Sequence, residues 1–284
     1  MRKVNIVDGQ NIGFIGCGNM GTSLLEAVVA SEVFPPSCIY VADTKKERLD
    51  AISRLHLNQV DNISLVKNCG VIILAVKPAD IPDVITEIKD FIDGSKILIS
   101  IAAGISTQTI ETLLADVPVP VIRVMPNLNV RVKAGLLPYC LGRYAKGYNS
   151  LAEKIFSLSG FVFELGEEKF DAITAISGSG PGFIFFIAEV IESICKAKSF
   201  TAEEADMITA YIIYGSGKML LDTKTAPSVL KQMVASPGGT TAAGLSVFME
   251  RGLREILEEA IDRAEKRSRE ISSGHLNFSC KKRT

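Results

Sequence analysis

Two glycine-rich turns that precede apolar segments carry the residues of this sequence best suited to chemistry. The first is Gly16-Cys17-Gly18-Asn19-Met20-Gly21, and the second is Ser236-Pro237-Gly238-Gly239-Thr240-Thr241. Backbone amides at a helix N-terminus bind anions, because they lack partners within the helix and lie at the positive end of its dipole. Both turns therefore predict sites for a phosphate or carboxylate. For the second turn, and for the similar stretch Ser177–Pro181, helix capping by the hydroxyls is the alternative.

The first turn has the spacing Gly-x-Gly-x-x-Gly between an apolar run and a helical pattern. In that setting Gly16 permits the tight turn, Gly18 lets a pyrophosphate approach the backbone, and Gly21 lets the helix pack closely on the strand. A glycine-rich turn without a ligand is the alternative. The strand and helix on either side favour a dinucleotide-binding site.

The choice between NADH and NADPH depends on the residues after the second predicted strand. Asp43 lies about twenty residues beyond Gly21, where such folds place the acid that binds the ribose diol of NADH. Thr44, Lys45 and Lys46 come directly after it. They suit the 2′-phosphate of NADPH or, alternatively, a capped and solvated helix start. Asp43 and Thr44 are therefore candidate cofactor residues, and the sequence leaves the cofactor open.

Acid–base chemistry usually draws on histidine, yet the sequence has only 2, His56 and His275, in a predicted surface helix and near the end of the chain. Hydride delivery to an imine needs no strong general acid, because the carbon of a protonated C=N group is already electrophilic. The sequence offers no Ser/His/Asp, Tyr/Lys or metal-ligating pattern, which favours chemistry of this kind.

The elements that must position these residues follow from the hydrophobic pattern. The first half alternates short β-branched runs with amphipathic segments, as in βαβ units that feed a parallel sheet. We expect strands at Ile12–Ile15, Ile39–Ala42, Val71–Val76, Ile97–Ile101 and Val119–Val124, with helices at Asn19–Ser31, Lys45–Leu55, Pro82–Phe91 and Thr107–Leu114 between them. An extended pair, Leu136–Leu141 and Val162–Leu165, flanks a helix near Asn149–Ser159. The second half predicts helices at Phe183–Lys198, Ala202–Leu221, Ser228–Val234 and Thr241–Ser272, the last interrupted at Gly252. The fold class is therefore α/β: a Rossmann-type doubly wound parallel sheet, then an all-helical domain.

Composition narrows the choice of partners. The 284 residues include 31 Lys plus Arg and 32 Asp plus Glu, for a net charge of −1, which predicts a small ligand and neither nucleic acid nor an anionic membrane. The cysteines, Cys17, Cys38, Cys69, Cys140, Cys195 and Cys280, have no metal-ligand spacing and are interpreted as reduced thiols, and we expect no metal.

Met1–Gln10 does not resemble a signal peptide. The apolar stretch Phe183–Ile194 contains two glutamates and is too short to span a bilayer. We therefore expect a cytoplasmic protein, with residues 275–284 as a frayed basic tail.

The quoted turns belong to a longer series of motifs. In order, these are GFIGCGNMG at 13–21, LAVKP at 74–78, SIAAGI at 100–105, RVMPN at 123–127, SGSGP at 177–181 and SPGGTTAAGL at 236–245. The series covers nearly the whole chain and resembles the pyrroline-5-carboxylate reductase family. The last motif is far more specific than the glycine turn.

The resemblance implies a Rossmann domain over residues 1–166 and a helical dimerisation and substrate-binding domain over 167–284, with an active site shared between subunits. It also implies NAD(P)H-dependent reduction of L-1-pyrroline-5-carboxylate to L-proline, the last step of proline biosynthesis. The cofactor is then NADPH, with NADH as the alternative, and the partner is a second copy in a homodimer that could assemble into a larger ring. The apolar helices of the second half, which have more than one face to bury, independently favour an oligomer; packing on the Rossmann domain is the alternative.

The resemblance also assigns residues. Those expected to contact the cofactor are Ile15, Gly16, Cys17, Gly18, Asn19, Met20, Asn62, Ala75, Val76, Lys77, Pro78 and Ala103. Ser236, Gly239 and Thr240 are expected to bind the substrate carboxylate, and Thr241 to hydrogen-bond the imine nitrogen as the catalytic residue. Some relatives carry an acid near that nitrogen where this chain has Lys224 and Thr225, so Glu167 is a candidate substitute.

Three alternatives compete with this interpretation. A relative that reduces another cyclic imine would share the same cofactor half. A β-hydroxy-acid dehydrogenase would too, but those enzymes rely on a helix-borne lysine. A regulatory NAD(P)-binding protein without turnover would retain the fold.

Overall fold

The computed structural model describes residues 10–115 and 117–276. Its strands are β1 (Ile12–Ile15), β2 (Ile39–Ala42), β3 (Asn58–Gln59), β4 (Val71–Leu74), β5 (Ile97–Ser100), β6 (Val121–Val124), β7 (Gly135–Leu141) and β8 (Gly160–Glu164). Its α-helices are α1 (Asn19–Ala30), α2 (Lys46–Ala51), α3 (Asn62–Asn68), α4 (Ile81–Ile88), α5 (Thr107–Leu113), α6 (Asn149–Phe156), α7 (Phe170–Ile173), α8 (Gly180–Ala197), α9 (Ala202–Thr223), α10 (Pro227–Val234), α11 (Thr240–Glu250) and α12 (Leu253–Leu276).

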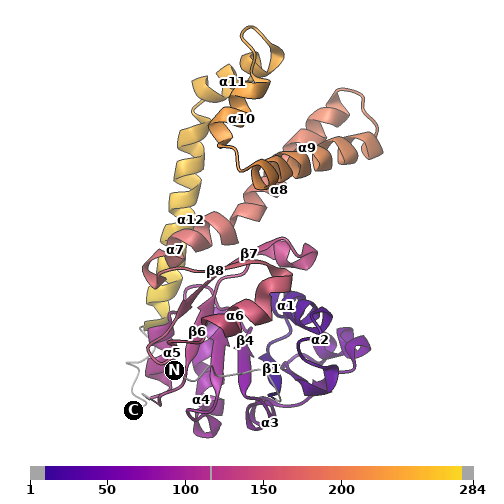
Figure 1. Cartoon of the computed structure of the whole chain (residues 1–284). Coiled ribbons are helices and arrows are strands. Elements are labelled where there is room, and N and C mark those ends of the chain that lie inside the picture. The colour runs from indigo at the N-terminus through magenta and orange to yellow at the C-terminus, as the bar shows by residue number, and fades with distance from the viewer. Residues whose placement is uncertain (1–9, 116, 277–284) are drawn as a thin grey trace. The chain divides into compact units, whose positions relative to one another are not determined.

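All described strands form one sheet in the order β3-β2-β1-β4-β5-β6-β7-β8 (Figure 1). The first six pair in parallel, β7 runs antiparallel to β6, and β8 is again parallel to β7. The order reverses direction between β1 and β4, so the strands on either side leave a crevice at their carboxyl ends. The predicted doubly wound sheet is confirmed.

The core lies on both faces of this sheet, because successive side chains of a strand point to opposite sides. In β4, Val71 and Ile73 join the cluster that includes Leu25 of α1. Ile72 and Leu74 join the other cluster, to which the helices α3, α4 and α5 contribute. A sheet buried on both faces holds the ends of its strands at fixed positions, and those ends carry the predicted cofactor residues.

The chain divides into two compact units, one comprising the sequence up to Gly178 and from Ala264 onward, the other Ser179–Arg263. The second unit is helical. Within it α8 and α9 pack side by side, and a capping box between Thr201 and Glu204 begins α9. Its buried residues are Cys195, Ala205 and Thr209, whereas many large apolar side chains, Phe185, Phe186 and Tyr211 among them, are exposed.

Several local expectations were wrong or incomplete. The short strand β3 and the helix α3 were not predicted; the two polar residues of β3 give no hydrophobic alternation. The helix expected from Lys45 to Leu55 is α2 followed by a short 3-10 turn. The break at Gly252 is confirmed, and its φ of +68° explains why a glycine ends the turn there.

The helical stretch around α8 is longer than the sequence suggested, so the expectation that it is too short for a membrane span was wrong. Taken together, the helical segments from Glu167 to Ala197 span 31 residues, and an 18-residue window within them has a mean hydropathy of 1.4, which is long and apolar enough to cross a bilayer by length and composition alone. This is weak evidence for a membrane, since core helices of soluble proteins pass the same test. The N-terminal residues 1–9 and the expected tail beyond residue 276 lie outside the described chain.

Candidate functional site

The first glycine turn joins the carboxyl end of β1 to α1 and requires its glycines. Gly16 has a φ of +102°, and a Cβ there would lie 2.7 Å from the carbonyl oxygen of Ala75. A Cβ on Gly21 would lie 2.4 Å from the carbonyl oxygen of Gly16. The turn is therefore held closely between the ends of β1 and β4, as the sequence predicts.

Gly18, by contrast, faces open space. A Cβ placed on it would meet only Nη1 of Arg48, at 4.0 Å, among the described atoms. Gly18 is the N-cap of α1 in extended conformation, and within residues 10–115 and 117–276 no side chain caps this helix and no acid lies in its first turn. The first amides of α1 thus have no side-chain cap among the described residues, and the first turn of the helix carries no acid of its own. This cradle fits the diphosphate of a dinucleotide.

Asp43 is hydrogen-bonded to the turn itself. Its Oδ2 accepts a hydrogen bond from the amide of Cys17 at 2.7 Å, and its Oδ1 accepts one from the amide of Lys45 at 2.8 Å. Nη1 of Arg48 lies 3.1 Å from Oδ2, and the Asp43 side chain is only 3% exposed. Burial opposes its ionisation, but these hydrogen bonds and the charge of Arg48 together lower the pKa of the carboxyl below its ordinary value.

Two consequences arise for the cofactor. Both carboxylate oxygens of Asp43 already have donors, so the acid expected to hold a ribose diol is occupied, and Cys17 uses its amide on Asp43 rather than on a ligand. Arg48 was not among the predicted site residues, because its spacing from Asp43 matches no motif. Its guanidinium nevertheless lies beside Gly18, and the exposed residues Thr44 and Lys45 precede it closely in the chain.

The other predicted cofactor residues lie at the same edge of the sheet. Asn62 comes after β3 at the start of α3 and donates from Nδ2 to Oε2 of Glu87 at 2.8 Å. Lys77 is exposed after β4 and precedes a 3-10 turn that begins at Pro78. The structure brings to the carboxyl ends of β1, β2, β3, β4 and β5 the residues Ile15, Gly16, Cys17, Gly18, Asn19, Met20, Asp43, Thr44, Asn62, Ala75, Val76, Lys77, Pro78 and Ala103.

Glu167 is engaged within the first unit. Its Oε1 and Oε2 accept hydrogen bonds from the amide and the hydroxyl of Thr107 at 2.8 and 2.7 Å, and Nη1 of Arg123 pairs with Oε1 at 3.3 Å. The carboxylate therefore holds the first turn of α5, where a negative charge complements the helix dipole. The guanidinium of Arg123, 4.5 Å from the centre of the Phe170 ring, completes the cluster.

The second glycine turn joins α10 to α11 in the helical unit. Gly239 is the N-cap of α11, and within the described chain no side chain caps this helix and no acid lies in its first turn. Gly238 has a φ of +73°, and the amide of Gly239 donates to the carbonyl of Ser236 at 2.9 Å. The capping alternative is thus wrong here, because neither Ser236 nor Thr240 caps the helix.

Ser236, Thr240 and Thr241 are at least partly exposed, so their hydroxyls and the first amides of α11 are accessible to an anion. The shorter stretch before α8 behaves similarly. Ser179 is its N-cap and makes no side-chain bond to the described helix, and Pro181 lies in the first helical positions, as its fixed φ favours.

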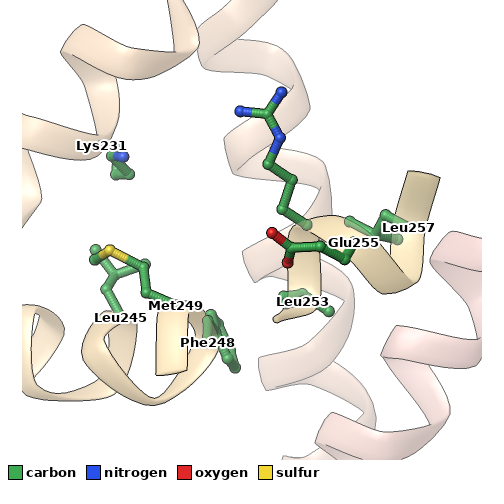
Figure 2. Close-up of a pocket in the computed structure, with 8 residues that line it drawn as sticks. Lys231, Leu245, Phe248, Met249, Leu253, Glu255 and Leu257 are labelled. Atoms are coloured by element: carbon green, nitrogen blue, oxygen red, sulfur yellow. The ribbon is translucent and has the colours of Figure 1, made fainter. Parts of the chain in front are cut away.

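The helical unit also contains a hollow of about 440 Å³ between α10, α11 and the start of α12 (Figure 2). Its lining is apolar apart from three charged side chains, and it includes Leu245 and Met249 of α11. The predicted site residues do not line it. Among the described residues, no group of three or more His, Cys, Asp or Glu side chains could hold a metal ion.

Comparison with known proteins gives two family matches. Residues 167–271 match the family described as pyrroline-5-carboxylate reductase dimerisation, and residues 11–104 match the family described as NADP oxidoreductase, coenzyme F420-dependent. Pyrroline-5-carboxylate reductase 1 of Bacillus subtilis is 32% identical over 273 residues, which cover 94% of this chain and 91% of that protein.

Two solved structures are similar over nearly the same extent. A pyrroline-5-carboxylate reductase from Coxiella burnetii has a TM-score of 0.84 at 33% identity, covering 93% of this chain and 98% of that one. Plasmodium falciparum pyrroline carboxylate reductase with NADP bound has a TM-score of 0.85 at 26% identity, covering 94% and 99%.

Proposed function

This chain belongs to the pyrroline-5-carboxylate reductase family, and from that premise we propose how its residues divide the work of the reaction. The protein is an NAD(P)H-dependent oxidoreductase that reduces the imine of L-1-pyrroline-5-carboxylate to L-proline in proline biosynthesis. NADPH is its cofactor. Together these require a diphosphate site, a 2′-phosphate site, a carboxylate site and a hydrogen-bond donor at the imine nitrogen.

The cofactor site is proposed at the carboxyl edge of the sheet. The free amides of α1 hold the diphosphate, while Thr44, Lys45 and Arg48 hold the 2′-phosphate. The small residues Ala75 and Ala103 leave room for the nicotinamide. When bound, NADPH supplies the hydride that the imine carbon accepts. Asp43 supports this site by fixing the glycine turn and orienting Arg48.

The substrate carboxylate is proposed to bind at the N-terminus of α11. Ser236 and Thr240 contribute hydroxyl donors there, and Gly239 leaves the helix end uncapped and open. Thr241 donates a hydrogen bond to the ring nitrogen and helps bring the proton that this nitrogen gains as the adjacent carbon gains hydride. Glu167 is not needed at this site, because its oxygens already bind Thr107 and Arg123.

The protein assembles as a homo-oligomer through its helical dimerisation region. We propose a dimer as the minimal assembly, dimers arranged in a larger ring as a further level, and the cytoplasm as the compartment. The apolar side chains exposed on α8 and α9 support the dimer. The described cysteines are all free thiols, which suits a reducing compartment.

The observation that carries the substrate assignment is the uncapped start of α11 in the SPGGTT turn. Its test is a substrate series in which the oxidation of NADPH is followed with the purified chain. L-1-Pyrroline-5-carboxylate should be reduced, whereas 1-pyrroline, which lacks the carboxylate, should lose kcat/KM about 100-fold or more because the anion site is left unpaired. A six-membered cyclic imine carboxylate that reacts faster than the five-membered substrate would instead favour the related-imine alternative. Tight NADPH binding without oxidation by any imine would favour the regulatory alternative.

A further inference from the structure

The loop after β6 holds the last turn of the first unit. Asn127 in this loop is 6% exposed, and its Nδ2 donates to both the carbonyl oxygen and the hydroxyl of Ser177 at 3.2 Å. Its Oδ1 accepts a hydrogen bond from the amide of Leu136, also at 3.2 Å. Ser177 is itself buried at 7% exposure. The side-chain amide of Asn127 therefore bonds through both its nitrogen and its oxygen, and it joins two segments that lie 50 residues apart in the chain.

Ser177 needs this bond because a proline lies four positions further along the chain. Ser177 is part of a π-helical turn, Thr174–Gly178, that immediately precedes α8. In a regular α-helix its carbonyl would accept a hydrogen bond from the amide of Pro181, but proline has no N–H group. Asn127 supplies the missing donor from another segment. Widened turns of this kind are rare in proteins, and those that occur are often found at functional sites.

Arg123 and Met125, shortly before Asn127, contact the rest of the stretch from residue 167 to 178. Arg123, Met125 and Asn127 are every second residue along the extended chain from β6 into the loop that follows, so their side chains lie on the same side of the chain. Arg123 binds Glu167 and the face of Phe170. The Cε methyl of Met125 lies 2.7 Å from the place that a Cβ on Gly178 would occupy. The stretch from residue 167 to 178 is thus fixed to β6 and its loop at both ends.

We propose that Asn127 is a positioning residue of the reductase. By holding the π turn, it fixes the last turn of the first unit, from which the chain continues into α8 and the residues that carry the substrate turn. This inference depends on the proposed function, because hydride transfer requires the imine carbon to lie at reacting distance from a nicotinamide on the sheet edge. A displacement of about 1 Å at such a distance can cost about 100-fold in rate.

Asn127→Asp is the sharpest test, since it keeps the shape of the side chain and its acceptor for Leu136 but replaces the donor with a charged oxygen. We expect kcat for imine reduction by the full-length chain to fall about 10-fold or more at about pH 8, with the Kd of NADPH, measured by nucleotide fluorescence, changed less than about twofold. Asn129→Asp is the matched control, because the Asn129 side chain makes no hydrogen bond to any described residue. It should leave both quantities unchanged.

The pH profile separates positioning from loss of structure. Burial raises the pKa of a carboxyl group, so the neutral form of the carboxyl introduced at position 127 should accumulate below about pH 7 and can then donate a hydrogen bond to the Ser177 carbonyl. The ratio of variant to wild-type kcat should therefore rise as the pH is lowered from about 8 to about 6. Equal losses in kcat and NADPH affinity, or a lowered melting temperature with unchanged kcat, would overturn the proposal.

If Asn127→Asp cannot be recovered folded, Ser177→Ala tests the same contact. It removes the hydroxyl acceptor and keeps the carbonyl, so kcat should fall about two- to fivefold at constant NADPH affinity, and an unchanged kcat would contradict the inference. Wild-type chain measured in parallel separates this result from the proposed function. If the wild type reduces the imine and the variants do so equally well, only the positioning role fails.

Discussion

Arg48→Ala should shift the cofactor preference of this enzyme from NADPH toward NADH. The guanidinium lies beside Gly18 and the side chain is 38% exposed, so a contact with the 2′-phosphate is partly screened by water. The carboxylate of Asp43, 3.1 Å away, also cancels much of its long-range field. What remains is a charge-assisted hydrogen bond of about 1.5 kcal/mol, or about 10-fold in affinity.

A second effect has the same direction. Without Arg48, the buried carboxylate of Asp43 loses its counter-ion and repels a phosphate dianion, while it becomes freer to accept a hydrogen bond from the 2′-hydroxyl of NADH. We expect a further factor of about three for a half-screened charge at this range. The ratio of kcat/KM with NADPH to kcat/KM with NADH should therefore fall about 30-fold in total.

The assay is a pair of initial-rate series with each reduced cofactor at fixed L-1-pyrroline-5-carboxylate. Arg54→Ala is the matched control, because Arg54 lies a little further along the chain, pairs with Glu26 at the surface, and changes the net charge equally. It should leave the ratio within about twofold. An Arg48→Ala enzyme with an unchanged ratio, or with both cofactors impaired to the same degree, would refute the assignment of Arg48 to the 2′-phosphate.

Three further outcomes are expected. Gly21→Ala should destabilise the fold by about 1–3 kcal/mol and weaken NADPH binding, since the new methyl would lie 2.4 Å from a backbone oxygen; thermal unfolding and fluorescence titration would detect both. Thr241→Ala should lower kcat about 10- to 100-fold with the NADPH Kd unchanged, and Thr241→Ser should restore most of it in the same rate assay. The pKa of Asp43 is lowered on folding, so its ionised carboxyl should stabilise the folded chain above about pH 4, and this stability should be lost as the pH falls through the pKa of the folded state. Acid unfolding of Asp43→Asn should therefore depend less on pH than that of the wild type.

Most of the sheet could be predicted because its strands are short, apolar and bounded by turn residues. A strand buried on both faces shows its burial in composition alone, as the run Val71–Leu74 does. The strand β3 was missed because Asn58 and Gln59 give no hydrophobic signal; pairing with β2 makes them a strand. The π turn before α8 could not be foreseen either. Ser177 in this turn accepts hydrogen bonds from Asn127, and contacts between distant segments leave no local pattern.

At the candidate site, Gly16 and Gly21 were predictable because close backbone contacts require them, which is what the Gly-x-Gly-x-x-Gly spacing indicates. The state of Asp43 was not, since the motif gives its position but not its partners. Only the folded chain shows that Cys17, Lys45 and Arg48 all donate to it. Likewise, the sequence could make Glu167 a candidate for the acid that some relatives carry, but it could not show that its carboxylate accepts hydrogen bonds from Thr107 at the start of α5.

The scarcity of buried residues in the helical unit has a consequence for how the enzyme is made. In the proposed dimer a second chain would cover Phe185, Phe186 and Tyr211, which a newly synthesised chain presents to solvent, so its maturation would be second order in chain concentration. Slow synthesis would lengthen the time each chain spends alone and raise its exposure to chaperones and proteases. Two alleles expressed together would also mix within one assembly, so a variant with a defective helical face could withdraw normal chains from the active pool.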